Sequence, residues 1–359
     1  MKNRYPSGWR FFLSGWVSGF VEEAILLCGL CTEGCARGNF FRIFVPFSEN
    51  VVMKSKINFA NPIWGHVLLF VAAAFFGGNA PMVKDLSEHG VSAVAVADFR
   101  SVGAAVAFWV ASFFVKRGRE RVSLHTLGKL FIASMLGIVL NQGLFTVGIS
   151  YTSPVNATIM ATMLPIIAML FSALIIKERI TLPKVVGLVI GLAGALLLVL
   201  GSGRGEGGGL KGDVMCLVAQ TCVGFYMVAF SKIVRRYSVF TLMKWMFLYS
   251  AIVLTVVTWP QLSAIDYASL PPMAWTEIVF IVFCGTFLSY VCFTFGQQVL
   301  SPTIVGMYNY VQPIVATILA VAIGVGRFGW REMIAMVLVF GGVYIVNRAK
   351  NFERARGNK

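Results

Sequence analysis

Long, continuous apolar runs separated by short polar joints occupy the chain from residue 63 onward. A helix that crosses a bilayer needs about 20 mainly apolar residues. Ten runs come close to that length, near 63–85, 91–115, 128–149, 153–176, 182–202, 213–234, 239–260, 274–296, 302–325 and 330–347. Because apolar and polar residues do not alternate within these runs, the strands of a membrane barrel are excluded. The sequence therefore predicts an all-α integral membrane protein with ten transmembrane helices.

Composition excludes the main alternatives to a membrane protein. Hydrophobic residues make up 58% of the 359 residues and charged residues only 13%. An ordinary soluble domain contains about 25% charged residues, with which it covers its surface. A soluble globular enzyme, a disordered protein and a disulfide-rich secreted module are therefore excluded.

Successive loops between the spans lie on alternate sides of the membrane. The basic residues are unevenly divided between the loops, or joints, of the two sides, and this predicts the orientation of the spans. Short cytoplasmic loops of membrane proteins accumulate Lys and Arg. One set of joints holds five basic residues, whereas the other set and the tail hold 17. We therefore expect both ends of the ten-span unit in the cytoplasm and the protein in the plasma (bacterial inner) membrane. In this setting the net charge of +15 indicates orientation and not a nucleic-acid partner.

Residues 1–52 differ from the rest of the chain. Glu22 and Glu23 interrupt an apolar stretch, so the segment lacks the clean apolar core of a secretory signal. Met53 is followed by two lysines and then by the first long apolar run, as in many inner-membrane proteins. We expect translation to begin at Met53 and the upstream segment to be a start-site artefact. An additional amphipathic or spanning segment is the alternative.

The chain repeats itself after a shift of 148 residues without gaps. In this register Gly137 corresponds to Gly285, Arg179 to Arg327, the pair Ser153-Pro154 to Ser301-Pro302, and Pro165 to Pro313. Shared membrane composition is the alternative explanation, but it does not account for two Ser-Pro pairs and two mid-span prolines in one register. An internal duplication is therefore predicted.

Each half contains five predicted spans. Because five is odd, the second half has to cross the membrane in the opposite direction, which makes two inverted five-helix repeats. We expect the first repeat over 63–202, a Gly-rich linker over 203–212, the second repeat over 213–347 and a basic cytoplasmic tail over 348–359. Many secondary transporters have this architecture, because two near-equal halves can exchange conformations around a central site.

Three stretches of the first half carry a family resemblance. They are the stretch from Asn156 to Pro165, the segment Lys-Glu-Arg-Ile-Thr over 177–181, and the Gly-rich span with Gly187, Gly191 and Gly194. With the tandem halves, they resemble the EamA family of the drug/metabolite transporter superfamily over roughly 63–347. One departure is Gly326, at the position that matches Glu178, where such proteins often keep a carboxylate. The resemblance implies transport, in the export direction, of a metabolite, an amino acid or a drug.

The two prolines at equivalent positions indicate where a solute would bind. Pro165 and Pro313 lie about 12 and 11 residues into their spans, or about 18 Å and 16 Å at 1.5 Å per residue, from opposite sides. A proline removes a backbone hydrogen bond and kinks a helix, which is tolerated in lipid only where a neighbour or water satisfies the freed carbonyl. Matched interruptions near the midplane are typical of a transporter binding site. Simple kinking for helix packing is the alternative.

Polar residues within the spans point to the same depth. Each favours a partner or water over lipid, so as a group we expect them to face a cavity and bind the solute. For any one of them, a structural hydrogen bond between helices is the alternative. These candidate binding residues are Asn79, Asn141, Gln142, Asn156, Tyr308, Asn309 and Gln312.

Asp98 and Arg100 are the charged residues deepest in a predicted span. They are two residues apart, about 200° around a helix, so they cannot easily pair with each other. We expect one to face the cavity and the other to meet a different helix. Coupling of transport to protons is the functional hypothesis for Asp98, with Arg100 as a second coupling candidate. Solvation near a helix end is the alternative for Asp98.

These features predict a secondary-active transporter that moves a small organic solute by alternating access around a midplane cavity. An intramembrane enzyme and a channel are the alternatives. The sequence contains no zinc-protease, serine-hydrolase or paired-aspartate motif, so we expect no catalytic residues, no metal site and no cofactor. The expected partners are the solute and membrane lipid, with no nucleic acid. The glycines of span 182–202 predict packing within the bundle, with a homodimer contact as the second explanation.

Overall fold

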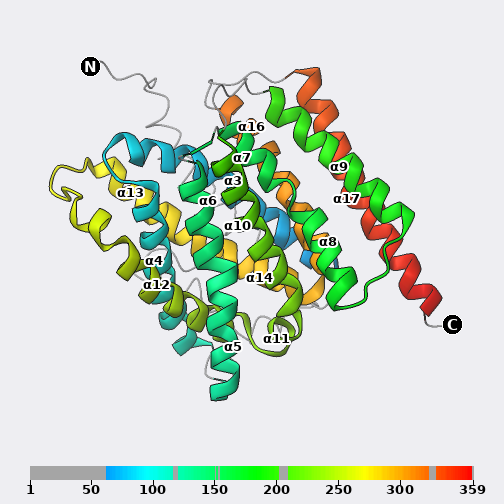
Figure 1. Cartoon of the computed structure of the whole chain (residues 1–359), viewed down its shortest axis with the longest axis horizontal. Coiled ribbons are helices and arrows are strands. Elements are labelled where there is room, and N and C mark those ends of the chain that lie inside the picture. Colours follow the sequence, from blue (N-terminus) through cyan, green and yellow to red (C-terminus); the bar gives the residue numbers. More distant parts are fainter. Residues whose placement is uncertain are drawn as a thin grey trace, which may run out of the picture.

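The computed structural model describes residues 62–115, 120–149, 151–152, 154–201, 209–322 and 329–357, and it forms a bundle of helices joined by short turns (Figure 1). The N-terminal extension predicted over 1–52 and most of the predicted linker lie outside these residues. In chain order the elements are α3 (Pro62–Glu88), α4 (Ala93–Phe114), α5 (Leu124–Ser134), η4 (Met135–Leu140), α6 (Asn141–Ile149), α7 (Pro154–Ala161), α8 (Leu164–Ile175), α9 (Leu182–Gly201), α10 (Leu210–Ala229), α11 (Ser231–Arg236), α12 (Val239–Ser263), α13 (Pro272–Val282), η5 (Phe283–Leu288), α14 (Ser289–Val299), α15 (Pro302–Met307), η6 (Tyr308–Tyr310), α16 (Val311–Ala322) and α17 (Trp330–Gly357).

Serine and proline set the beginnings of many of these helices. The hydroxyl groups of Ser92, Ser123 and Ser238 each accept a hydrogen bond from the backbone N–H three residues later, which satisfies one of the free donors of a helix start. Proline stands at the first position of α3, α7, α13 and α15, where its missing N–H carries no penalty. The polar joints of the sequence therefore act as helix boundaries.

Eight helical segments of the described chain are long and apolar enough to cross a membrane. They are Pro62–Asn79, Ala93–Phe114, Leu124–Ile149, Asn156–Ile175, Leu210–Ala229, Val239–Ser263, Pro272–Val299 and Trp330–Ala349. The predicted spans 182–202 and 302–325 are not among these eight; the first contains the shorter apolar helix Leu182–Leu197. The structure thus shows an all-helical, multi-pass membrane protein, whereas the number of ten spans stays a prediction.

Apolar residues occupy both the interior and the outer surface of the bundle. In the interior, the buried ring of Phe108 lies 5.4 Å from Phe247 and 4.6 Å from Phe287, measured between ring centroids. On the outside, Val256 and Val337 are 73% and 71% exposed. Lipid is the solvent in which such a surface is stable, because hydrocarbon carries no penalty for contact with aliphatic side chains.

The helices repeat with the predicted period of 148 residues. Helix α5 corresponds to α13 and η4 to η5, residue for residue at both ends. Helix α9 corresponds to α17, which begins 148 residues after it, and α4 corresponds to α12. Both η4 and η5 are turns of π-helix, a rare conformation, so its recurrence at equivalent positions shows that the duplication extends to local backbone geometry.

Equivalent helices of the two halves pack against each other and run in opposite directions. Helices α9 and α17 lie side by side (Figure 1), with Gly187 close to Val346 and Gly194 close to Ala335. As the residue number rises on α9, that of its neighbour on α17 falls. Helices α4 and α12 follow the same rule: Asp98 contacts Thr255, whereas Trp109 contacts Trp245.

Both spans with a mid-span proline are interrupted a few residues before that proline. Helix α7 ends at Ala161 and α8 begins at Leu164, so that Pro165 lies in the first turn of a new helix. In the second half, the 3₁₀ turn η6 separates α15 from α16, ahead of Pro313. Pro165 has no N–H to donate to the carbonyl of Ala161, and the amide Nδ2 of Asn309 donates to that carbonyl at 2.7 Å instead.

We expect Gly342→Ala to destabilise the contact between α9 and α17. A Cβ at Gly342 would lie 2.5 Å from the carbonyl oxygen of Gly187 and 2.7 Å from the backbone nitrogen of Gly191. Overpacking of this kind costs about 1–3 kcal/mol, so the thermal unfolding midpoint of the detergent-solubilised protein should fall. Gly341→Ala, at the neighbouring position, is the control because no atom lies within 4 Å of its added Cβ. An equal loss in both variants would contradict the described contact.

We expect Asn309→Leu to destabilise the protein because it leaves the carbonyl of Ala161 without a donor. An unsatisfied buried acceptor costs about 1–3 kcal/mol. Pro165→Ala restores a backbone N–H that can serve this carbonyl, so Asn309→Leu should cost less in that background. A double-mutant cycle on unfolding midpoints measures this coupling. Pro260→Ala, inside α12, is the control proline and should show no coupling to Asn309→Leu.

Candidate functional site

The interruptions in the two proline-containing spans meet each other through Asn309. Its amide Nδ2 donates to Ala161, and its Oδ1 accepts a hydrogen bond of 2.7 Å from Nε2 of Gln312. Ala161 and Asn309 are 148 residues apart, so they occupy the same position in the two halves. Asn309, a predicted binding residue, therefore connects the halves where both spans are broken, and Gln312 bonds to it from the same half.

A second pair of equivalent residues, in the span that precedes the proline-containing span of each half, is also in contact. Nε2 of Gln142 donates to the hydroxyl oxygen of Tyr290 at 3.3 Å, and these residues are also 148 apart. Equivalent residues can contact each other only close to the axis that relates two halves. The two pairs therefore locate the pseudo-twofold axis between α6 and α14 and between α7 and η6. Oε1 of Gln142 is buried and has no hydrogen-bond partner in the described part of the chain.

Aromatic rings from both halves surround Tyr290. Phe76 of α3 and Phe247 of α12 contact it edge to face, with centroid separations of 5.6 Å and 4.9 Å. Phe293, one turn further along α14, is 6.3 Å away. The hydroxyl of Tyr290 thus stands at the axis, within an aromatic enclosure.

Two further predicted binding residues bond to backbone carbonyl groups between helices. Nδ2 of Asn79 donates to the carbonyl of Gly285 in η5 at 3.0 Å, and its Oδ1 is buried without a partner in the described residues. A Cβ at Gly285 would overlap the Asn79 amide, so only glycine allows this approach. Nδ2 of Asn141 donates to the carbonyl of Ala219 in α10 at 3.1 Å. These are interhelical structural hydrogen bonds, which the sequence left open as the alternative.

The last two predicted binding residues have partners outside these pairs. Asn156, in the first turn of α7, lies 3.5 Å from Asp213 at the start of α10, and Thr152 donates to the same carboxylate. The hydroxyl of Tyr308 is 2.8 Å from Nδ1 of His66, in the first turns of α3. The predicted binding residues are thus not all gathered in one place.

Asp98 and Arg100 bond to different helices and not to each other, whereas the expectation that one of them faces a cavity stays a prediction. Asp98 is only 3% exposed and accepts a hydrogen bond of 2.8 Å from Thr255 of α12. This burial excludes the alternative that Asp98 is solvated near a helix end. Arg100 is partly buried, and its Nε donates to the hydroxyl of Thr286 in η5 at 2.9 Å.

Sequence reasoning missed a second buried carboxyl group. Glu277 of α13 is 2% exposed, and its Oε2 has no hydrogen-bond partner in the described residues; the neighbouring carboxyl group is that of Asp85 near the end of α3. Asp85 also lies 3.6 Å from the imidazole of His89. The signal was present, because Glu277 is a carboxylate inside the predicted span 274–296, close to its end.

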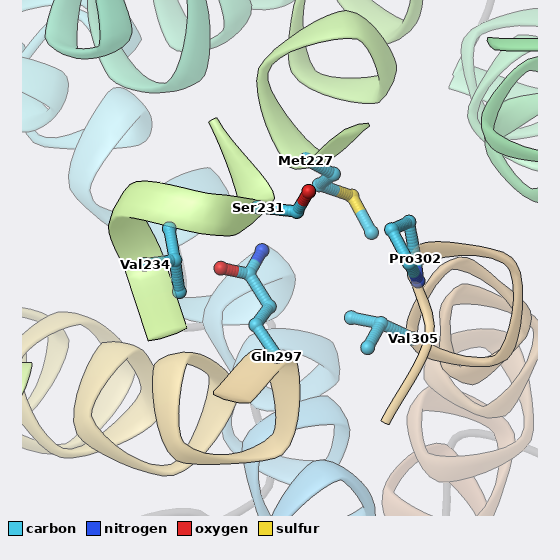
Figure 2. Close-up of a pocket in the computed structure, with 6 residues that line it drawn as sticks. All are labelled: Met227, Ser231, Val234, Gln297, Pro302 and Val305. Atoms are coloured by element: carbon cyan, nitrogen blue, oxygen red, sulfur yellow. The ribbon is translucent and has the colours of Figure 1, made fainter. Parts of the chain in front are cut away.

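A small pocket lies elsewhere, between α10, α11, α14 and α15 (Figure 2). Its volume is only about 10 Å³, and it is lined by Met227, Ser231, Val234, Gln297, Pro302 and Val305. Gln297 is 7% exposed and extends its amide toward Ser231 and Val234. Neither amide atom of Gln297 has a hydrogen-bond partner in the described residues. This pocket contains none of the predicted binding residues, and its helices all belong to the second half.

The structure has a counterpart among solved proteins. One crystal structure superposes on 78% of this chain and 95% of its own chain with a TM-score of 0.64, at 18% sequence identity. At that identity the likeness concerns the fold alone.

Relatives by sequence include proteins from plants and bacteria. A WAT1-related protein of Arabidopsis thaliana is 23% identical over 80% of this chain and 86% of its own length. Two uncharacterized transporters of Bacillus subtilis, YetK and YyaM, are 19% and 22% identical. Their alignments cover 85% and 58% of this chain, and 92% and 70% of their own lengths.

The model of the EamA-like transporter family matches the chain twice, over residues 63–200 and 210–348. The two matches cover most of the chain and correspond to its two halves. The resemblance seen in the sequence is therefore confirmed, and the intramembrane-enzyme alternative is excluded. The protein belongs to the EamA-like transporter family of the drug/metabolite transporter superfamily.

Proposed function

We propose that this transporter moves a small organic solute by alternating access, with the solute bound where the two halves meet. The observation that carries the proposal is the contact between equivalent residues, Gln142 with Tyr290 and Ala161 with Asn309, at two helix interruptions and beside a π-helical turn. Broken helices and polar groups inside a membrane are tolerated where they line a protected or water-filled space. Such a space between two related halves is where secondary transporters bind their solutes.

The topology that we propose has ten spans in two inverted repeats of five. Support comes from the antiparallel pairing of α4 with α12 and of α9 with α17, since an inverted duplication places equivalent helices in opposite directions. Eight spans are the helical segments of sufficient length and hydropathy described above. In the proposed topology the two remaining spans are α9 and the α15–α16 segment. The repeats extend over 63–202 and 213–347, joined by the 203–212 linker.

The orientation that we propose places both ends of the ten-span unit in the cytoplasm of the plasma (bacterial inner) membrane. The excess of Lys and Arg in one set of loops and in the tail 348–359 supports it. In this orientation α8, α11 and α15 lie toward the cytoplasm, whereas α7 and α16 lie toward the outside.

Solute binding is proposed at the residues that the axis brings together. Gln142, Asn309 and Gln312 belong to this set, as does Asn79 beside η5, while Pro165 and Pro313 hold the interruptions open. Asn141, Asn156 and Tyr308 remain proposed cavity residues, and each already has a structural partner. The resemblance to exporters of metabolites, amino acids and drugs supports export as the direction.

Asp98 is proposed as the coupling residue. It is a carboxyl group buried within a span, and its Oδ1 accepts from Thr255 on the equivalent helix of the other half. A proton bound by such a group neutralises a charge that is expensive to keep inside a membrane. Its occupancy can therefore bias the contact between α4 and α12, which any rocking of the halves has to change.

We expect the purified protein in liposomes to catalyse saturable counterflow. Vesicles loaded with an unlabelled solute should transiently accumulate the labelled solute against its gradient, with no chemical change in the solute. Liposomes without protein are the control. Since a channel cannot couple the two fluxes, flux that equilibrates without an overshoot would contradict the carrier mechanism.

Asp98→Asn keeps the hydrogen bond to Thr255 but removes the titrating group, so we expect it to abolish the stimulation of transport by a proton gradient. Counterflow, which needs no gradient, should persist within a few-fold of the wild type. Asp266→Asn, in an exposed turn, is the matched control. If the pH dependence of Asp98→Asn equals that of the wild type, Asp98 is not the coupling residue.

A further inference from the structure

Arg100 is a partly buried intramembrane cation without a counter-ion in the described part of the chain. Among the described residues its side chain makes one hydrogen bond, from Nε to Thr286, and the two terminal nitrogens of the guanidinium have no bonded acceptor there. No carboxylate of the described chain lies within ion-pair distance of Arg100, although such pairs form elsewhere. A charge at this depth costs about 2.5–3.5 kcal/mol on insertion scales, so it needs a compensating group.

The other buried cations of the described chain have such groups. Lys184 lies 3.3 Å from the carboxylate of Glu178 and donates to a backbone carbonyl at 2.8 Å. Lys244 lies over the ring of Trp109, with its Nζ 5.1 Å from the ring centroid. Both are therefore explained as structural charges. Arg100 is not, because a neutral hydroxyl is its bonded partner.

The position of Arg100 places it beside the axis. Thr286, its partner, belongs to η5 and lies four residues before Tyr290, which accepts the hydrogen bond of Gln142. Arg100 and Tyr290 both keep part of their surface accessible, whereas Thr286 is fully buried. Arg100 is thus bonded four residues before Tyr290, one of the residues at which the halves meet.

From these observations we propose that Arg100 binds the anionic head group of the transported solute, which makes the solute a small organic anion with a carboxylate or phosphate group. This inference rests on the proposed function, since it assigns a solute class to the same central site. A guanidinium whose Nε is held by Thr286 presents its two terminal nitrogens in a fixed fork, which matches two anionic oxygens. The rings of Phe76 and Phe293 beside Tyr290, both partly exposed, supply an apolar surface for the rest of the solute.

The test compares probes that share one ring and differ in the head group. Benzoate, phenyl phosphate, benzamide and benzylammonium are titrated onto the full-length purified protein, and the shift in thermal unfolding midpoint is measured at constant ionic strength. We expect benzoate, phenyl phosphate or both to stabilise the protein, and the amide and the ammonium not to. The two anions distinguish a carboxylate site from a phosphate site.

Arg100→Gln should weaken the binding of the anion at least about 30-fold, because it leaves the anion without its charged partner. Arg100→Lys keeps the charge but loses the fork, so its affinity should lie between those of Arg100→Gln and the wild type. Arg121→Gln removes an exposed arginine and is the control for net charge; it should bind as the wild type does. A monodisperse elution profile shows that each variant is folded.

The proposal is wrong if none of the four probes stabilises the wild type, if the neutral or cationic probe binds as well as the anions, or if a folded Arg100→Gln keeps its affinity. These outcomes are separate from the carrier mechanism. Counterflow of a cation or a neutral solute would refute the anionic solute and leave the carrier mechanism standing. Arginine-dependent binding of an anion without counterflow would support the anionic solute and refute the carrier mechanism.

Discussion

A carbonyl group freed inside the membrane has to find another donor, and this requirement governs the centre of the protein. Pro165 cannot donate to Ala161, and the donor comes from Asn309 on the other half of the chain. The interruption of one span is therefore stable only when the second half is in place. Gln312 holds the Asn309 amide in position through Oδ1.

The same reasoning explains why polar residues gather around the axis and charged residues around the ends. At the axis, hydroxyl and amide groups bond to one another or to carbonyl groups that π-helical and broken segments expose, as Asn79 does with Gly285. At the ends, full charges such as Lys184 and Glu178 pair with each other. Asp98 and Arg100 depart from this division, and the departure of Arg100, which has no counter-ion among the described residues, is what makes its chemistry informative.

Much of the architecture could be predicted because it follows from apolar run length, loop charge and a repeat in one register. Proline positions indicated the interruptions, although the helix ends before Pro165 and not at it. The sequence could not show which polar residues meet, because contacts such as Gln142 with Tyr290 depend on three-dimensional symmetry. Nor does any residue type mark a π-helix, so η4 and η5 were not foreseen. Glu277 was missed because a carboxylate close to a span end is usually solvated.

The bond from Asn309 to Ala161 has a consequence for the ancestry of the two halves. In an ancestor made of two identical subunits, each interruption would have needed its own donor, at the same position in both copies. Here that position is an asparagine in one half and an alanine in the other, so only a single donor remains. Two copies of the first half would leave both carbonyl groups unpaired. A homodimer of the first repeat alone would therefore lack the hydrogen bonds that stabilise the two interruptions.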